Sequence, residues 1–156
     1  MVVAMCAPLL VTAIQVGLRP ASEPWDQVAA YLDRHVAAGE QVWLYPNDSA
    51  LPLREAGANM SRMRGVPGDY PATGFKGINR MGSPAVVSVT PSQAVQIARN
   101  AASAKVPTVW LVTRQPGLFD PANDLPKALA EVRRPGRSQE WGYIKVQPYY
   151  SRGSGR

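Results

Sequence analysis

The sequence begins with an uncharged stretch of eighteen residues, MVVAMCAPLLVTAIQVGL, and Arg19 carries its first side-chain charge. As an α-helix this stretch would be roughly 27 Å long, close to the ~30 Å hydrocarbon core of a bilayer. No basic residue precedes it, unlike in an ordinary secretion signal, and a domain of this size has few elements to cover an apolar helix on every side. We therefore predict a membrane-spanning helix, or the truncated end of one, over residues 1–19. An atypical signal peptide and a buried core helix are the alternatives.

Beyond residue 19 the pattern changes to alternating helices and strands. Apolar residues at helical spacing predict helices, and short apolar runs rich in β-branched residues predict strands. The predicted helices cover residues 23–38, 47–57, 91–104 and 124–134, and the predicted strands cover residues 41–46, 85–89, 106–114 and 139–150. This alternation favours a three-layer α/β domain with right-handed crossovers and a mainly parallel sheet. We assign residues 20–150 to this domain and residues 151–156, SRGSGR, to a flexible tail.

The basic residues gather in one part of the chain. The formal net charge is +6, and seven basic residues against one acid between positions 62 and 114 account for the whole excess. Residues 60–84 are rich in glycine and proline and lack periodicity, which predicts a long loop, and long loops in compact domains are commonly functional. Guanidinium groups match the geometry of phosphate. We expect a phosphate or lipid headgroup to bind this loop through Arg62, Arg64, Lys76 and Arg80; a merely solvated loop is the alternative.

One acid is placed where a ligand could reach it. Ligands of α/β sheets gather at the carboxyl ends of the strands, and that edge is predicted to hold the segments after Pro46, Val89 and Arg114. Asp48 follows the first predicted strand at this edge, so it joins the candidate binding residues. The alternative for Asp48 is turn and N-cap chemistry within the sequence PNDSA.

Several classes of chemistry have no support in the sequence. Cys6 is the only cysteine and His35 the only histidine, so neither an intrachain disulfide nor a structural zinc site is expected. The chain contains no GxGxxG fingerprint, no Walker A loop and no GxSxG elbow. We therefore predict no catalytic residue, no metal ligand and no cofactor in this chain. RNA-binding motifs are also absent, and nucleic acid is not an expected partner.

The order of the segments resembles a known family. The quoted stretches are PWDQVAAYLDRHVAAGEQVWLYPNDSALPL after the apolar run, then PTVWLVTRQPGLFDP, and finally WGYIKVQPYYSR. Together they resemble the C-terminal soluble domain, with the end of the last transmembrane helix, of bacterial polyprenyl-phosphate-sugar-dependent membrane glycosyltransferases. These enzymes are related to dolichyl-phosphate-mannose–protein mannosyltransferases and to the aminoarabinose transferase of lipid A.

The resemblance implies a location and a role. In that family the soluble domain is α/β and lies on the periplasmic side of the inner membrane, while the active site lies in the membrane part, which this chain does not contain. The chain alone is therefore not expected to catalyse transfer, and no catalytic residue carries over. The implied partners are membrane lipid, the polyprenyl-phosphate sugar donor and the remaining transmembrane part. A membrane-anchored or secreted α/β module that binds anionic lipid or glycan is the alternative function.

Overall fold

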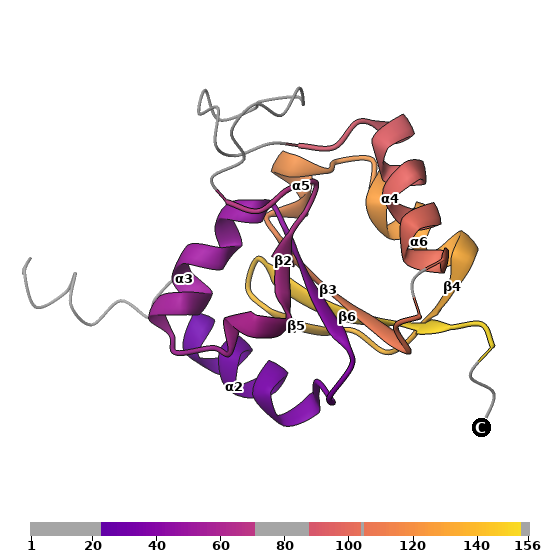
Figure 1. The fold of residues 1–156 in the computed structure, drawn as a ribbon. Coiled ribbons are helices and arrows are strands. Elements are labelled where there is room, and N and C mark those ends of the chain that lie inside the picture. The colour runs from indigo at the N-terminus through magenta and orange to yellow at the C-terminus, as the bar shows by residue number, and fades with distance from the viewer. Residues whose placement is uncertain (1–22, 71–87, 104, 154–156) are drawn as a thin grey trace, which may run out of the picture.

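The computed structural model describes residues 23–70, 88–103 and 105–153. They form a mixed α/β domain around a six-stranded sheet (Figure 1). The helices are α2 (Trp25–His35), α3 (Ala50–Glu55), α4 (Pro91–Ser103), α5 (Pro116–Phe119) and α6 (Asp124–Val132), with short 3₁₀ helices η1 (Asn47–Ser49) and η2 (Met60–Arg62). The strands are β1 (Gln41–Tyr45), β2 (Met63–Gly65), β3 (Thr108–Arg114), β4 (Arg133–Pro135), β5 (Gln139–Trp141) and β6 (Ile144–Ser151).

The sheet is mixed, which corrects the expectation of a mainly parallel one. Its strand order is β2-β1-β3-β6-β4, and β5 also pairs with β6. Strands β2, β1 and β3 are parallel, whereas β6 runs antiparallel to β3, β4 and β5. The reason is the turn between β5 and β6, where Trp141 pairs with Ile144 and Gly142 has a φ of +56°. A two-residue turn joins antiparallel neighbours only, because a parallel connection needs a crossover.

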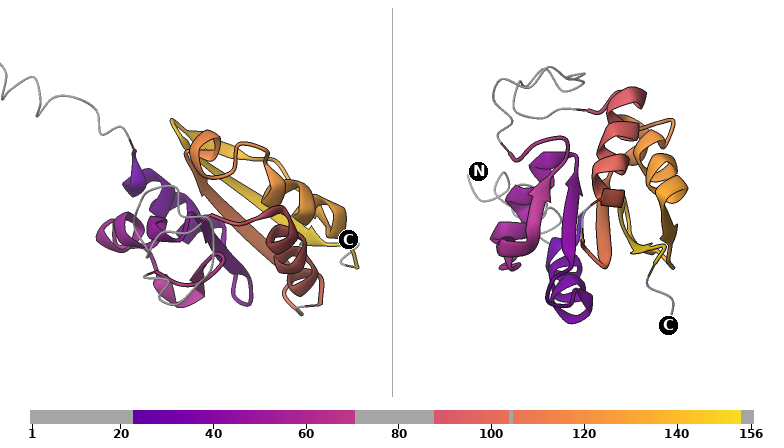
Figure 2. Two further views of the ribbon diagram at one scale, coloured as in Figure 1. Left: turned by 90° about the horizontal axis from the view of Figure 1, so that it is seen from above. Right: turned by 45° about the vertical axis from the view of Figure 1, so that its right-hand side comes forward.

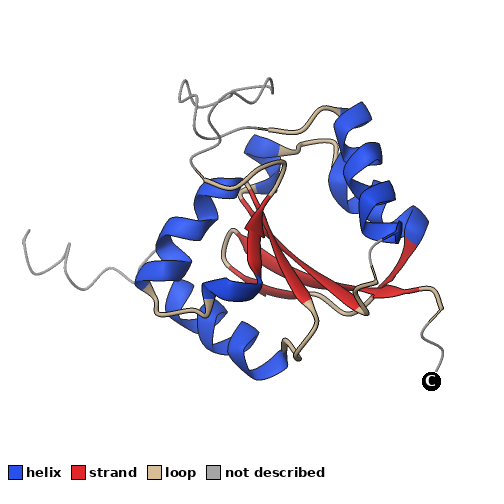
Figure 3. Ribbon diagram, in the orientation of Figure 1, coloured by secondary structure: helices blue, strands red, loops and turns tan. Residues whose placement is uncertain are grey.

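Helices cover both faces of the sheet (Figures 2 and 3). Side chains from α2 and α3 share one apolar core with one set of strand residues, and those from α4 and α6 share a second core with the other set. Strand β3 is buried from Thr108 to Thr113 and supplies both cores, with Leu111 on the α4 side and Trp110 on the α2 side. Its uninterrupted apolar run is typical of a strand covered on both faces.

Helices α2 and α4 form where apolar spacing predicts them, whereas the short helix α5 lies in a segment expected to be a turn-rich connection. In α2, the buried residues Val28, Ala29 and Leu32 lie on one face, with Leu32 one turn after the other two, and the extended backbone of Val36 ends the helix. In α4 the buried positions are Ala94, Ala98 and Ala101, and these small side chains let the helix approach the sheet and α6 closely.

An arginine is buried where α6 passes into β4. Arg133 is 1% exposed. Its Nε and Nη2 donate to the carbonyl oxygen of Ala101 at 3.2 and 2.7 Å, and Nη2 also donates to Val106 O at 2.9 Å. Nη1 makes longer bonds of 3.4 Å to the carbonyl oxygens of Pro107 and Tyr149. Arg133 thus links the end of α4, the approach to β3 and strand β6, and its burial lowers its pKa.

Two predicted segments fall largely beyond what the structure describes, and the short strands β2 and β4 were missed, since residues 133 and 134 were predicted as the end of a helix. The predicted apolar helix (1–19) and most of the predicted strand at 85–89 lie outside the described residues. Within the described ranges, no helix combines the length and apolarity that a bilayer crossing requires. Residues 63–65, expected to belong to a loop, form β2 along the edge of β1. Three residues are too few to show an alternating pattern, and β2 is stabilised by pairing with β1.

Candidate functional site

The arrangement of β1 and β3 marks one edge of the sheet as the place for a ligand. From β1 the chain enters α3, which packs on the α2 side, and then returns to β2. From β3 it enters α5 and α6 on the opposite face. Adjacent parallel strands whose connections leave in opposite directions form a topological switch point, and ligands of open α/β sheets bind just outside it. The candidate site is therefore the carboxyl-end edge of β1 and β3.

Arg114, the last residue of β3, forms a charged cluster at this edge. Its Nε donates to Glu23 Oε1 at 2.9 Å, and its Nη1 donates to Asp48 Oδ2 at 3.0 Å. Gln115 Nε2 also donates to Glu23 Oε1, at 3.3 Å, and Trp25 Nε1 donates to Glu23 Oε2, at 3.1 Å. The cluster joins three separate elements: the entry to α2, the turn after β1 and the end of β3.

The cluster is shielded enough to shift the pKa values of its groups. The side chains of Arg114, Glu23 and Asp48 are 21, 17 and 16% exposed. Burial alone raises the pKa of Glu23, but hydrogen bonds from Arg114, Trp25 and Gln115 outweigh it, so the pKa is lowered. For Asp48 burial prevails over the attraction of Arg114, and its pKa is raised. Burial by itself lowers the pKa of Arg114, but the attraction of its two acidic partners outweighs burial. The pKa of Arg114 is therefore raised overall, and the guanidinium stays charged.

Polar groups of η1 extend the site. Asn47 and Ser49 are fully buried. Asp48 Oδ1 and Ser49 Oγ are also buried and have no hydrogen-bond partner among the described residues. Both atoms are enclosed by the fold, so a buried water, rather than a larger ligand, is what could satisfy them. One guanidinium between two carboxylates carries a net charge of −1, which suits a hydroxyl-rich ligand better than an anion.

The backbone next to β1 leaves little room at this edge. A β-carbon on Gly65, the last residue of β2, would lie 2.5 Å from the carbonyl oxygen of Gly68 and 2.9 Å from Asn47 Cβ. The Gly65 amide donates to Asp69 Oδ1 at 2.6 Å. Glycine at position 65 thus lets the turn after β2 close against η1. The Asp69 carboxylate stabilises that turn by accepting the hydrogen bond from the Gly65 amide.

Tyr45 joins the end of β1 to the segments on the α4 side. Its hydroxyl donates to the carbonyl oxygen of Phe119 at 2.9 Å and accepts from the amide of Val89 at 3.1 Å. Asp120, which follows Phe119, accepts from the amides of Asp124 and Leu125 and so caps α6. Both carboxylate oxygens of Asp120 are therefore engaged by backbone amides, and its role is structural.

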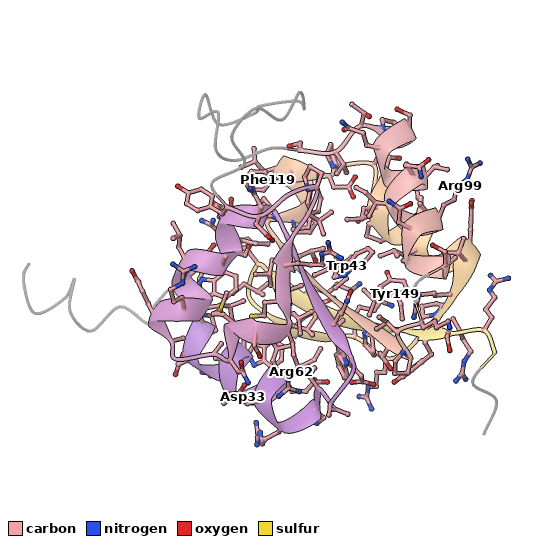
Figure 4. The ribbon with its side chains drawn as sticks, viewed as in Figure 1. Asp33, Trp43, Arg62, Arg99, Phe119 and Tyr149 are labelled. Atoms are coloured by element: carbon pink, nitrogen blue, oxygen red, sulfur yellow. The ribbon has the colours of Figure 1, made fainter. Side chains whose placement is uncertain are left out.

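The structure separates the predicted binding residues. Arg62 donates through Nη1 to the carbonyl oxygen of Val36, 2.6 Å away, just beyond the end of α2. Figure 4 shows Arg62 beside α2, at the opposite end of the molecule from Phe119. Asp48 belongs to the Arg114 cluster and is not brought together with Arg62. Lys76 and Arg80 lie outside the described residues.

Arg64 has different surroundings. It is exposed on β2 and lines a hollow of about 170 Å³. Trp43, Asp69, Ile97 and Asn100 are among the other lining residues. Of the three predicted site residues that the structure describes, Arg64 has its guanidinium available at a concave surface. The hollow thus brings together an aromatic ring, a carboxylate, an amide and a guanidinium. Such groups bind sugars and anions in other proteins.

Sequence reasoning located the edge but missed the cluster. The segments after Pro46 and Arg114 were predicted to share one edge, and Arg114 and Asp48 do meet there. Glu23 could not be found in this way because it lies 91 residues from Arg114 along the chain. The one available signal was its position just after the apolar run.

No known family assigns a role to this site. Over residues 23–70, 88–103 and 105–153, no three His, Cys, Asp or Glu side chains gather in a way that could hold a metal ion. No protein-family model matches the chain, and no curated protein matches it.

Opposite pKa shifts predict opposite effects of removing the two carboxylates. A lowered folded-state pKa means that ionised Glu23 stabilises the fold above about pH 4.3, the ordinary glutamate value. This contribution fades as the pH falls through the folded-state pKa. In the full chain held in a mild detergent, Glu23→Gln is expected to lower the free energy of unfolding at pH 7 by about 1 kcal/mol, with a smaller difference near pH 4. Urea unfolding followed by tryptophan fluorescence measures it, and an equal loss at both pH values would contradict the prediction.

Asp48→Asn is expected to behave in the reverse sense. A raised folded-state pKa means that ionised Asp48 costs stability above that pKa, and the cost disappears as the pH falls to the ordinary aspartate value. The asparagine carbonyl can still accept the hydrogen bond from Arg114. At pH 7 the variant should therefore be as stable as the wild type or more so, and the advantage should shrink on acidification. A clear loss at pH 7 in the same urea titration would count against the raised pKa.

Proposed function

We propose that this chain is the C-terminal periplasmic domain, with the end of the last membrane helix, of a bacterial membrane glycosyltransferase. The enzyme transfers a sugar from a polyprenyl-phosphate donor, in the manner of mannosyltransferase-like proteins. Transfer itself takes place in the transmembrane part, and this chain covers that site from the periplasm. The partners are membrane lipid, the sugar donor and the remaining transmembrane part.

The observation that carries the proposal is the ion pair between Glu23 and Arg114, 2.9 Å long. Leu18 is the last residue of the uncharged run. Four residues lie between Leu18 and Glu23, and the five steps of chain that join the two span at most about 18 Å. With residues 1–18 in the bilayer, the Glu23 carboxylate brings the carboxyl-end edge of β1 and β3 close to the membrane surface. The candidate site then faces the side from which a lipid-linked sugar is presented.

The chemistry of this edge fits the sugar better than the phosphate. Both carboxylates of the cluster accept hydrogen bonds, and the side chains of Glu23 and Asp48 are 17 and 16% exposed. Sugar hydroxyls donate to such oxygens. The net negative charge of the cluster disfavours a phosphate there. The donor phosphate is instead bound by the basic residues predicted from the sequence. Among them, Arg64 lines a hollow.

The Arg64 hollow also favours a second candidate function, an anchored or secreted module that binds anionic lipid or glycan. Arg64 is exposed there beside Trp43 and Asn100. Binding through exposed guanidinium groups weakens as salt screens their charge. This second candidate therefore predicts association with anionic vesicles that is lost at high salt, even without residues 1–18.

Topology and linkage test the first candidate. A full-length Cys6→Ser, Arg99→Cys variant in a bacterial host should stay in the membrane pellet after alkaline carbonate extraction. Its single thiol, on the exposed face of α4, should react with an impermeant maleimide once the outer membrane is permeabilised. Extraction into carbonate, or labelling only after cell lysis, would contradict a periplasmic membrane-anchored domain.

The enzymatic half of the proposal needs the missing membrane part. The genome immediately upstream should encode a run of hydrophobic spans with an acidic residue in the first outer loop. Membranes containing both parts should transfer radiolabelled sugar from a polyprenyl-phosphate donor, and membranes containing either part alone should not. Full transfer in the absence of this chain, or an unrelated protein encoded upstream, would overturn the assignment.

A further inference from the structure

Two exposed apolar side chains share one hollow at the candidate edge. Among the described residues, Leu118 and Tyr143 are the most exposed large apolar side chains, at 42 and 64%. Both line a shallow hollow with Gln115, Pro116 and Gly117. The Gln115 amide donates to the Tyr143 carbonyl oxygen at 2.9 Å, which holds α5 against the β5–β6 turn. We call residues 115–118 together with Tyr143 the Tyr143 patch.

The Tyr143 patch adjoins the end of the chain that carries the apolar run. Gln115 Nε2 donates to Glu23 Oε1 at 3.3 Å. Glu23 also pairs with Arg114, the residue before Gln115. In Figure 2, seen from above, α5, the β5–β6 turn and the start of α2 lie on the same side of the domain. The patch is thus tied to a residue within five positions of Leu18.

We propose that the Tyr143 patch docks onto the surface of the bilayer that holds residues 1–18. Docking in this form rests on the proposed function, because it requires residues 1–18 to lie in lipid. A tether of at most about 18 Å keeps the patch at the interface, which makes insertion effectively intramolecular. Tyrosine suits this position because its ring is apolar and its hydroxyl reaches water or headgroups.

The charges around the patch indicate the kind of lipid surface. The Arg114 guanidinium is neutralised by Glu23 and Asp48, and on the turn side Lys145 lies 3.7 Å from Glu140. The residues that line the hollow, 115–118 and Tyr143, carry no basic side chain. Docking is driven by apolar contact, so it should occur on neutral phosphatidylcholine and should survive high salt. This separates it from salt-sensitive binding by Arg64.

A probe placed inside the patch tests docking without altering Leu118 or Tyr143. A β-carbon on Gly117 would meet no atom within 4 Å. The full-length Cys6→Ser, Gly117→Cys chain, labelled with the fluorophore NBD and reconstituted in phosphatidylcholine vesicles, should show blue-shifted emission. It should be quenched severalfold more by lipids carrying a shallow spin label, and severalfold less by aqueous iodide, than the same probe at Arg99→Cys on exposed α4.

Disrupting the patch provides the matched comparison. Leu118→Asp or Tyr143→Asp, in the Gly117→Cys background, should expose the probe to water. Its blue shift should then be lost, and aqueous iodide should quench it as strongly as the Arg99→Cys probe. Val95→Asp should leave it docked, because Val95 is 40% exposed but lies on α4 and is not one of the residues that line the hollow. All readings should be the same in low and high salt. Circular dichroism of each variant shows whether the domain remains folded.

The other occupants of the patch give different results. If the chain pellets with the vesicles but iodide quenches the Gly117 probe as strongly as the Arg99 probe, docking is overturned while the membrane anchor stands. Shielding from both quenchers means that residues 1–18 or a second copy cover the patch, and this also overturns docking. If the chain does not associate with vesicles at all, both the anchor and docking fail.

Discussion

Replacing Arg133 with methionine is expected to lower the free energy of unfolding by about 3 kcal/mol. Methionine can fill much of the space, but it donates no hydrogen bond. The carbonyl oxygens of Ala101 and Val106 would lose hydrogen bonds of 2.7 and 2.9 Å from the guanidinium of Arg133, a residue that is 1% exposed. Hydrogen bonds to a charged donor contribute about 1.5–3 kcal/mol each, and buried acceptors without donors are costly.

The measurement is urea unfolding of the full chain in a mild detergent at pH 7. Arg99→Met is the control, because Arg99 is exposed on α4, and such a surface change is expected to stay within about 0.5 kcal/mol. Arg133→Lys should fall between the two, since one ammonium group cannot take the place of the forked guanidinium at several carbonyls. If Arg133→Met is no less stable than Arg99→Met, the linking role of Arg133 is wrong.

The second large effect is expected for Arg114→Met, with a loss of about 2–3 kcal/mol at pH 7. The substitution leaves the shielded carboxylates of Glu23 and Asp48 close together without their shared cation. The pKa of Asp48 is already raised by burial, and it should rise further when Arg114 is lost. Stability of the variant should therefore recover as the pH is lowered and these groups are protonated.

A combined variant separates unpaired charge from lost packing. Glu23→Gln and Asp48→Asn added to Arg114→Met should restore part of the lost stability, because no buried charge is then unpaired. Arg54→Met, at an exposed position on α3, serves as the control and should change the unfolding free energy little. A triple variant that is less stable than Arg114→Met alone would show that the cluster contributes chiefly through its hydrogen bonds.

The regular elements could be predicted from the sequence because their signals are local. The spacing of Val28, Ala29 and Leu32 predicts α2, and the continuous apolar run of β3 predicts a strand buried on both faces. The closing segment was predicted as a strand as well. Its folding back as the β5–β6 hairpin depends on the turn at Gly142, whose φ is +56°. That turn makes the sheet mixed.

The candidate site could be predicted only in outline. The position of Asp48 after a buried strand placed it at the ligand edge, since that follows from strand direction alone. Its partnership with Arg114 and Glu23 required the folded chain, because Glu23 lies 91 residues from Arg114. The grouping of Arg62 with Arg64 rested on nearness in sequence, whereas Arg62 contacts the end of α2 and Arg64 lines a separate hollow.

The sequence by itself determined helices α2, α3, α4 and α6 and the central strands β1 and β3, and it marked the uncharged run at residues 1–18. Apolar periodicity records which side of each segment is buried, and that information is local. The tertiary structure decided which polar groups meet: Glu23 with Arg114, and Arg133 with the carbonyl oxygens of Ala101 and Val106. Such pairs form between distant segments, so they exist only after apolar burial has brought those segments together.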